Sequence, residues 1–196
     1  MSELITRRTF QATFGAGVLL AAAADPVPPA DKKAAGDPKP TEARFDRDYE
    51  APKFKPSWKR PQLNRQMVQD FVIYGHFDPA MVKKLLDKEP ALLNAAMDWG
   101  AGDWETALGG ASHLGRRDIA EILIERGARA DIFTAAMLGQ LEIVKALLTF
   151  QPKLIDAKGP HGLPLLHHAK VGGKGSAAVL AYLQSLKPAE TATKKS

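Results

Sequence analysis

Three histidines lie close together near the C-terminal end of the chain, and they are the first candidates for chemistry. His161, His167 and His168 fall within the segment KGPHGLPLLHHA. Imidazole nitrogens bind transition metals, but adjacent helical residues point about 100° apart, so His167 and His168 cannot readily share one ion. Pro164 places His161 in the loop before that helix. The position directly before Ala169 holds no Asp or Glu to complete a ligand set, so binding of a metal or other ligand by His161 and His167 stays an alternative interpretation.

A second candidate is the glycine-rich segment DWGAGDWE, which carries two tryptophans. Trp99 and Trp104 combine a large contact area with a polar tip, which is typical of a binding surface. Asp98, Asp103 and Glu105 flank them, and we expect a solvated acidic loop. The two indoles either lie exposed on this loop or cover an apolar face beneath it, and the sequence leaves both possibilities open.

No catalytic constellation is found elsewhere in the chain. The sequence contains no cysteine, which excludes disulfides, thiolate metal sites and cysteine nucleophiles. No nucleophile with an adjacent base and no two carboxylates set to share acid and base duties are found. Gly172, Gly173 and Gly175 lack the preceding strand of a phosphate-binding loop and predict a turn. We therefore predict a protein that is not an enzyme and has no cofactor and no assigned metal ligands.

These residues must be positioned by helices, because the apolar pattern around them has a helical period. Between Asp118 and Arg126 the apolar side chains form one stripe and the charged ones face the other way. The stretch from Thr106 to Ile132 recurs twice downstream as small residues, a glycine, an Ile/Leu-rich run and a turn. Gly115 and Gly139 separate a short helix from a longer one in this pattern, where a positive φ is often required.

The recurring stretch resembles the ankyrin repeat. In the unit TALGGASHLGRRDIAEILIERGARADI the residues that match the family are Thr106, Leu108, Ala111, Ser112, Gly115, Asp118, Ile119, Leu123, Ile124, Gly127 and Ala128. A third unit follows as IFTAAMLGQLEIVKALL, a fourth as GLPLLHHAKVGGKGSAAVLAYL, and a weaker first unit as VQDFVIYGHFDPAMVKKLLDKEP. The resemblance implies an all-α ankyrin-repeat solenoid of about four helix-turn-helix units with short finger loops, spanning residues 65–187.

In ankyrin repeats the finger tips and the first helix of each pair form a concave groove. The resemblance therefore implies a non-enzymatic, monomeric module that holds a protein or peptide partner. The residues predicted to contact this partner are Trp99, Trp104, His113, Met137, His161 and His167. In the same register His168 takes an inward position, where we expect it to form a hydrogen bond within the stack.

The N-terminus carries a different signal. Thr6, Arg7, Arg8 and Phe10, followed by the apolar run from Ala12 to Ala24, resemble a twin-arginine export signal spanning residues 1–24. The resemblance implies a periplasmic or cell-envelope location. Thirteen helical residues span about 20 Å, against roughly 30 Å of hydrocarbon, so no stable membrane anchor is expected.

The remaining segments predict tails rather than a second domain. Residues 25–64 are rich in proline and lysine and predict an extended, solvated linker, although Phe54 to Trp58 could instead dock on the stack. Residues 188–196 predict a frayed tail. The chain has a net charge of +5, but residues 66–196 carry 15 Lys and Arg against 14 Asp and Glu, which argues against a nucleic-acid-binding surface.

Overall fold

The computed structural model describes residues 43–54, 56–57 and 59–186. The predicted export signal with Arg7, Arg8 and Phe10 lies outside the described residues, as does the predicted tail 188–196. The chain divides into two compact units, Met1–Lys55 and Pro56–Ser196. In the first unit the described residues contain no helix or strand, and Phe54 is exposed.

The second unit is mainly helical. Its α-helices are α1 (Arg65–Tyr74), α2 (Pro79–Lys88), α3 (Ala107–His113), α4 (Arg117–Glu125), α5 (Ile132–Met137), α6 (Leu141–Phe150), α7 (Leu165–Val171) and α8 (Ala177–Leu186). The short 3₁₀ helices are η1 (Pro90–Asn94), η2 (Pro152–Asp156), η3 (Pro160–Gly162) and η4 (Gly173–Ser176). Strands β1 (Ala96–Asp98) and β2 (Trp104–Thr106) form an antiparallel hairpin. The described residues therefore agree with the predicted all-α class, apart from this hairpin.

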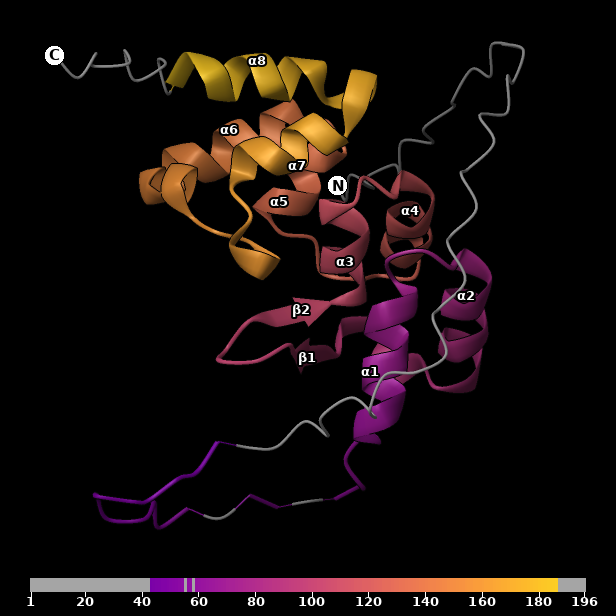
Figure 1. Ribbon diagram of the computed structural model, residues 1–196, viewed down its shortest axis with the longest axis vertical. Helices are drawn as coiled ribbons and strands as arrows, with labels where there is room; N and C mark the ends of the chain where they lie inside the picture. The colour runs from indigo at the N-terminus through magenta and orange to yellow at the C-terminus, as the bar shows by residue number, and fades with distance from the viewer. Residues whose placement is uncertain (1–42, 55, 58, 187–196) are drawn as a thin grey trace, which may run out of the picture. The chain divides into compact units, whose positions relative to one another are not determined.

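The helices are arranged as consecutive pairs. Each pair, α1 with α2, α3 with α4, α5 with α6 and α7 with α8, is in contact, and the first helices α1, α3, α5 and α7 contact one another in series. Figure 1 shows this succession from α1 and α2 at one end to α8 at the other. One core, centred on Phe71, Leu92 and Leu123, fills the first half, and a second, centred on Val144, Leu165 and Leu183, fills the other. Each amphipathic helix buries its apolar stripe against its neighbours.

The reversals between the paired helices depend on glycine. Gly115 and Gly139 have φ values of +69° and +74°, as the sequence predicted. A Cβ atom at Gly139 would collide with the backbone carbonyl of Gly175, so this turn also needs the missing side chain for close packing. The Gly115 turn approaches the backbone carbonyl of Val171 at the end of α7, and the Gly139 turn approaches that of Gly175 in η4.

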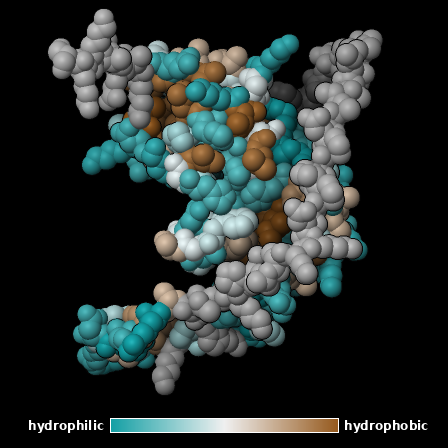
Figure 2. Space-filling view, viewed as in Figure 1, coloured by the Kyte–Doolittle hydropathy of each residue, from teal (hydrophilic) through white to brown (hydrophobic). Residues whose placement is uncertain are grey.

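The β1–β2 hairpin protrudes from the helical body in Figure 2. At its turn, Asp98 Oδ1 accepts hydrogen bonds from the backbone N–H groups of Gly100 and Gly102, at 2.8 and 3.1 Å. At its end, Thr106 caps α3 by accepting a hydrogen bond from the Gly109 N–H at 3.1 Å. Over the described ranges, no helix has the length and apolar character to cross a membrane.

Candidate metal centre

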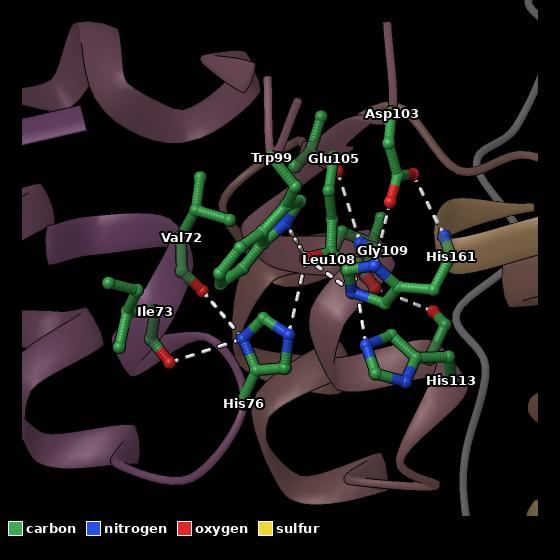
Figure 3. Close-up of polar contacts among 12 residues, drawn as sticks. Val72, Ile73, His76, Trp99, Asp103, Glu105, Leu108, Gly109, His113 and His161 are labelled. Carbon is green, nitrogen blue, oxygen red and sulfur yellow. Dashed lines mark hydrogen bonds and ion pairs between the residues drawn. The ribbon is translucent and has the colours of Figure 1, made fainter. Parts of the chain in front are cut away.

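Four side chains from four separate segments converge beside the hairpin (Figure 3). His76 follows α1, Glu105 is the central residue of β2, His113 ends α3, and His161 lies in η3. Each offers one nitrogen or oxygen atom, and these atoms all lie within 4.8 Å of one another. The cluster joins residues that are far apart in the sequence, so the fold itself creates it.

Glu105 is the centre of this cluster because of the strand alternation. Trp104 is 63 % exposed, whereas the next residue, Glu105, is 1 % exposed and points into the stack. Its Oε2 accepts a hydrogen bond of 2.7 Å from the indole N–H of Trp99. A buried carboxylate needs positive partners, and this one faces three imidazoles. The prediction of a solvated acidic loop is therefore wrong for Glu105.

The backbone of α1 fixes the tautomer of His76. Its Nδ1 lies 2.9 Å from the carbonyl oxygen of Val72 and 3.2 Å from that of Ile73. Carbonyl oxygens only accept, so Nδ1 must carry the hydrogen and donate it. In the neutral ring, Nε2 then bears a lone pair, and this atom lies 3.2 Å from Glu105 Oε2.

Asp103 fixes His161 in the same way. The Nδ1 of His161 donates a hydrogen bond to Asp103 Oδ2 at 2.8 Å. In the neutral ring, the lone pair is again on Nε2, which lies 3.6 Å from Glu105 Oε2. Histidine ligands of metals commonly donate their other ring N–H to a carboxylate or a carbonyl, and His161 and His76 show one example of each.

The contact between His113 and Glu105 lacks hydrogen-bond geometry. His113 Nε2 and Glu105 Oε1 lie 3.1 Å apart, but both atoms are buried and neither has a hydrogen-bond partner. Buried polar atoms without a partner are uncommon in folded proteins. A cation between the imidazole and the carboxylate would satisfy both atoms at once.

Space for these side chains comes from Gly110 in α3. A Cβ atom there would lie 2.6 Å from Cε1 and 2.8 Å from Nδ1 of His76. His76 is held by two backbone carbonyls and cannot move away without losing those hydrogen bonds. The missing side chain at Gly110 therefore lets the imidazole pack closely against α3.

The surroundings shift the pKa values of this cluster in opposite directions. Burial alone would raise the pKa of Glu105, but the imidazoles of His113 and His76 and the indole of Trp99 outweigh it and lower the pKa to about 2. Burial alone would lower the pKa of His76, but the neighbouring Glu105 carboxylate and the backbone carbonyls raise it overall. Glu105 is therefore ionised at neutral pH and attracts a positive partner.

The spacing suits a small cation. Zinc bonds of about 2.0–2.1 Å in a tetrahedral site place neighbouring ligand atoms roughly 3.3 Å apart. His113 Nε2 lies 3.1 Å from Glu105 Oε1, and the Nε2 atoms of His76 and His161 lie 3.2 and 3.6 Å from Oε2. All four ligand atoms lie within 4.8 Å of one another, so a small shift of the side chains would bring them to a common ion. Three imidazole nitrogens and one carboxylate oxygen form a ligand set that zinc, copper, nickel and iron all accept.

The structure distributes the predicted partner-contact residues unevenly. Trp99 and Trp104 are exposed, in agreement with one of the two alternatives. Met137 is fully buried in the first core and His113 is 7 % exposed, so neither can contact a partner on the surface. Met137 packs inward because helix α5 lies between α3 and α7 and has little free face.

The other two residues predicted to contact a partner, His161 and His167, take part in different interactions. His161 joins the metal-ligand cluster, whereas Nε2 of His167 bonds to the backbone carbonyl of His113 at 2.9 Å. His161 and His167 therefore do not form a shared site. His168 is buried, and its Nδ1 donates to the Pro164 carbonyl, which confirms the expected hydrogen bond within the stack.

Sequence reasoning missed His76 and Glu105 and gave His113 another role. These residues share no local motif, because the ligands come from four segments that only the stacked fold brings together. The available signal was positional: two of the histidines lie at the end of the first helix of successive repeats, and Glu105 alternates with an exposed tryptophan in the finger.

Comparison of the chain with known protein families, with curated proteins and with solved structures found no match. The function is therefore inferred from the geometry of the site.

Proposed function

We propose that this protein binds a divalent transition-metal ion, most favourably zinc, through His76, Glu105, His113 and His161. The observation that carries the proposal is the buried Glu105 carboxylate, which faces three imidazole Nε2 atoms, two of them in the metal-binding tautomer. Without a proton or a cation between them, these lone pairs and the carboxylate repel one another.

The charge of the site favours a divalent ion. Glu105 and Asp103 contribute two negative charges, and the imidazoles are neutral when they ligate a metal. A 2+ ion therefore balances the two carboxylates and offsets the cost of burying the charge of Glu105. Protonation of the imidazoles is the competing way to balance the charge, so metal binding releases protons.

A site with four protein ligands favours binding over catalysis. Structural zinc sites are closed by four protein ligands, whereas catalytic sites keep one position for water or substrate. We therefore propose a non-enzymatic protein. When ions bind only the folded state at about 100 times the dissociation constant, they add about 2.7 kcal/mol to the free energy of unfolding. For a domain of this size, the melting temperature then rises by roughly 10 °C.

The test compares metal binding by the full chain and by Glu105→Gln. Calorimetric titration with Zn²⁺, after treatment with a chelator, should give one ion per wild-type chain and a higher melting temperature. The glutamine side chain keeps the volume of Glu105 and its amide can donate to an imidazole, so the variant should fold but lose binding. His167→Gln is the matched control, because it changes a histidine outside the cluster and should keep full stoichiometry. If the wild-type chain binds no Zn²⁺, Co²⁺, Ni²⁺ or Cu²⁺, the proposal is wrong.

We also propose that the scaffold is an ankyrin-repeat stack that is exported by the twin-arginine route to the periplasm or cell envelope. The succession of helix pairs and the positive-φ glycines Gly115 and Gly139 support the repeat interpretation. The motif around Arg7 and Arg8 supports the export interpretation. Cell fractionation tests export: replacing both arginines with lysine should keep the protein in the cytoplasm, and unchanged export would contradict the proposed route.

A second candidate function is the binding of a protein or peptide by the monomer at the outer face of the hairpin. The exposed Trp104 borders a pocket of about 310 Å³ that Phe133 and Lys158 also line. Tryptophan is one of the residues enriched among interface hot spots, and this one lies exposed at the rim of the pocket. Cross-linking in envelope extracts should capture a partner that Trp104→Ala loses; retention of the same partner by that variant would exclude this face.

A further inference from the structure

The candidate metal site is asymmetric. The side chains of Glu105, His113 and His76 are 0, 9 and 14 % exposed, because the helices α1 and α3 and the hairpin cover them. The side chain of His161, by contrast, is 34 % exposed. An ion can therefore reach the three inner ligands most directly past His161.

Asp103 is the residue that holds His161 in place. Its Oδ1 accepts the backbone N–H of His161 at 2.8 Å, and its Oδ2 accepts the Nδ1–H at 2.8 Å. His161 has a φ of +57°, a left-handed conformation that is unfavourable for a residue with a side chain. Two hydrogen bonds to one carboxylate therefore fix both the position and the tautomer of the outer ligand.

The hydrogen bonds within the surrounding loop do not orient this ring. Residues 159–163 close on themselves, with the Gly159 N–H donating to the Leu163 carbonyl at 2.9 Å and the Gly162 N–H donating to the Gly159 carbonyl at 3.1 Å. These bonds shape the backbone of the loop and leave the imidazole of His161 to Asp103. The ring packs edge-on against Trp99 and His113, with centroids 5.4 and 5.1 Å away.

We propose that His161 is the displaceable ligand through which the ion is exchanged with solvent, and that Asp103 is a positioning residue that sets how long the ion stays bound. This inference rests on the proposed metal-binding function. Asp103 does not contact the ion; it acts by holding the hydrogen of the neutral ring on Nδ1, which leaves the lone pair on Nε2 and directs it at the three inner ligands. When those two hydrogen bonds break, His161 swings outward and three ligands remain.

The substitution Asp103→Asn tests the role of the acceptor. If the new carbonyl oxygen still accepts the backbone N–H of His161, the amide N–H₂ faces Nδ1. Nδ1 must then accept, so the proton moves to Nε2, and this tautomer cannot ligate a metal. Asp103→Asn therefore keeps the shape of the side chain but disables His161 as a ligand.

The experiment measures the rate at which the Zn²⁺-loaded full chain releases zinc to an excess of a coloured chelator. Asp103→Asn should speed release by about ten- to a hundredfold, the usual loss of metal affinity when an outer-shell partner is removed. His161→Ala removes the ligand itself and should speed release by at least as much. The double variant should release zinc no faster than His161→Ala alone, because Asp103 acts only through His161. Asp87→Asn, an exposed aspartate paired with Arg126, is the matched control and should release zinc at the wild-type rate.

The outcomes separate this inference from the proposed function. If the wild-type chain binds no zinc, the proposed function fails. If it binds zinc and Asp103→Asn releases it at the wild-type rate, or if the effects of the two substitutions add, the inference alone fails. NMR of the metal-free wild-type protein gives a second test that needs no variant: the neutral ring of His161 should carry its proton on Nδ1, and a proton on Nε2 would overturn the inference.

Discussion

Replacing Glu105 with glutamine in the metal-free protein should change stability in a way that depends strongly on pH. Folding lowers the pKa of Glu105 from 4.5 to about 2, which corresponds to about 3 kcal/mol of stability for the ionised form. This contribution is fully present above pH 4.5 and is lost as the pH falls toward 2. Folding raises the pKa of His76, so its contribution is present below its ordinary pKa of 6.5 and is lost as the pH rises through the folded-state value.

The opposite pH dependences of Glu105 and His76 predict that the cost of Glu105→Gln passes through a maximum as the pH changes. The carboxylate is ionised and His76 is protonated between about pH 4.5 and 6.5, and there Glu105→Gln should cost the most. Hydrogen bonds from the amide to the imidazoles offset part of the loss, so we expect a cost of about 1–3 kcal/mol. At higher pH, where His76 is neutral, the cost should shrink.

Urea unfolding of both proteins in the presence of a chelator, across this pH range, measures the difference. Glu121→Gln is the matched control, because Glu121 pairs with Arg117 on the surface of α4 with 56 % of its side chain exposed. Its effect should be small and nearly independent of pH. A cost for Glu105→Gln that does not vary with pH would refute the charge pairing between Glu105 and His76.

Three further predictions concern other positions. Gly110→Ala should weaken zinc binding at least about tenfold in a calorimetric titration, because its Cβ would displace His76; unchanged affinity would contradict the packing of this imidazole. Gly139→Ala should destabilise the protein by more than about 2 kcal/mol in urea unfolding, because its Cβ would collide with the Gly175 carbonyl. Gly127→Ala, at a φ of +93° but in open space, should cost about 1 kcal/mol. Equal costs for the two variants would argue against the collision at Gly139. Burial lowers the pKa of His168, so the neutral imidazole should persist below pH 6.5 in an NMR titration. The free energy of unfolding should fall as the pH drops below 6.5, because the unfolded chain then binds a proton that the buried ring does not. Titration of His168 at or above pH 6.5 would contradict this effect of burial.

The helices could be predicted from the sequence better than the site. The helices depend on residues close together in the sequence, whereas the site joins residues that are far apart. The stripe in α4 and the glycine turns at Gly115 and Gly139 are local patterns, and local physics decides them. The partners of His161 are not local: Asp103 and Glu105 approach it only after the stack has formed. The alternation of Trp104 with Glu105 is the one local sign that this carboxylate faces inward, and it is too short to set Glu105 apart from the acidic residues of a solvated loop.

The order of the ligands along the chain has a consequence for synthesis. A nascent polypeptide that has emerged only as far as α6 already carries the three inner ligands, but it lacks the outer one, which follows Pro160. Tight capture of an ion would therefore wait until the last helix pair has docked. Metal occupancy would then report on whether a newly made molecule is complete, and partly made chains would stay free of tightly held ions.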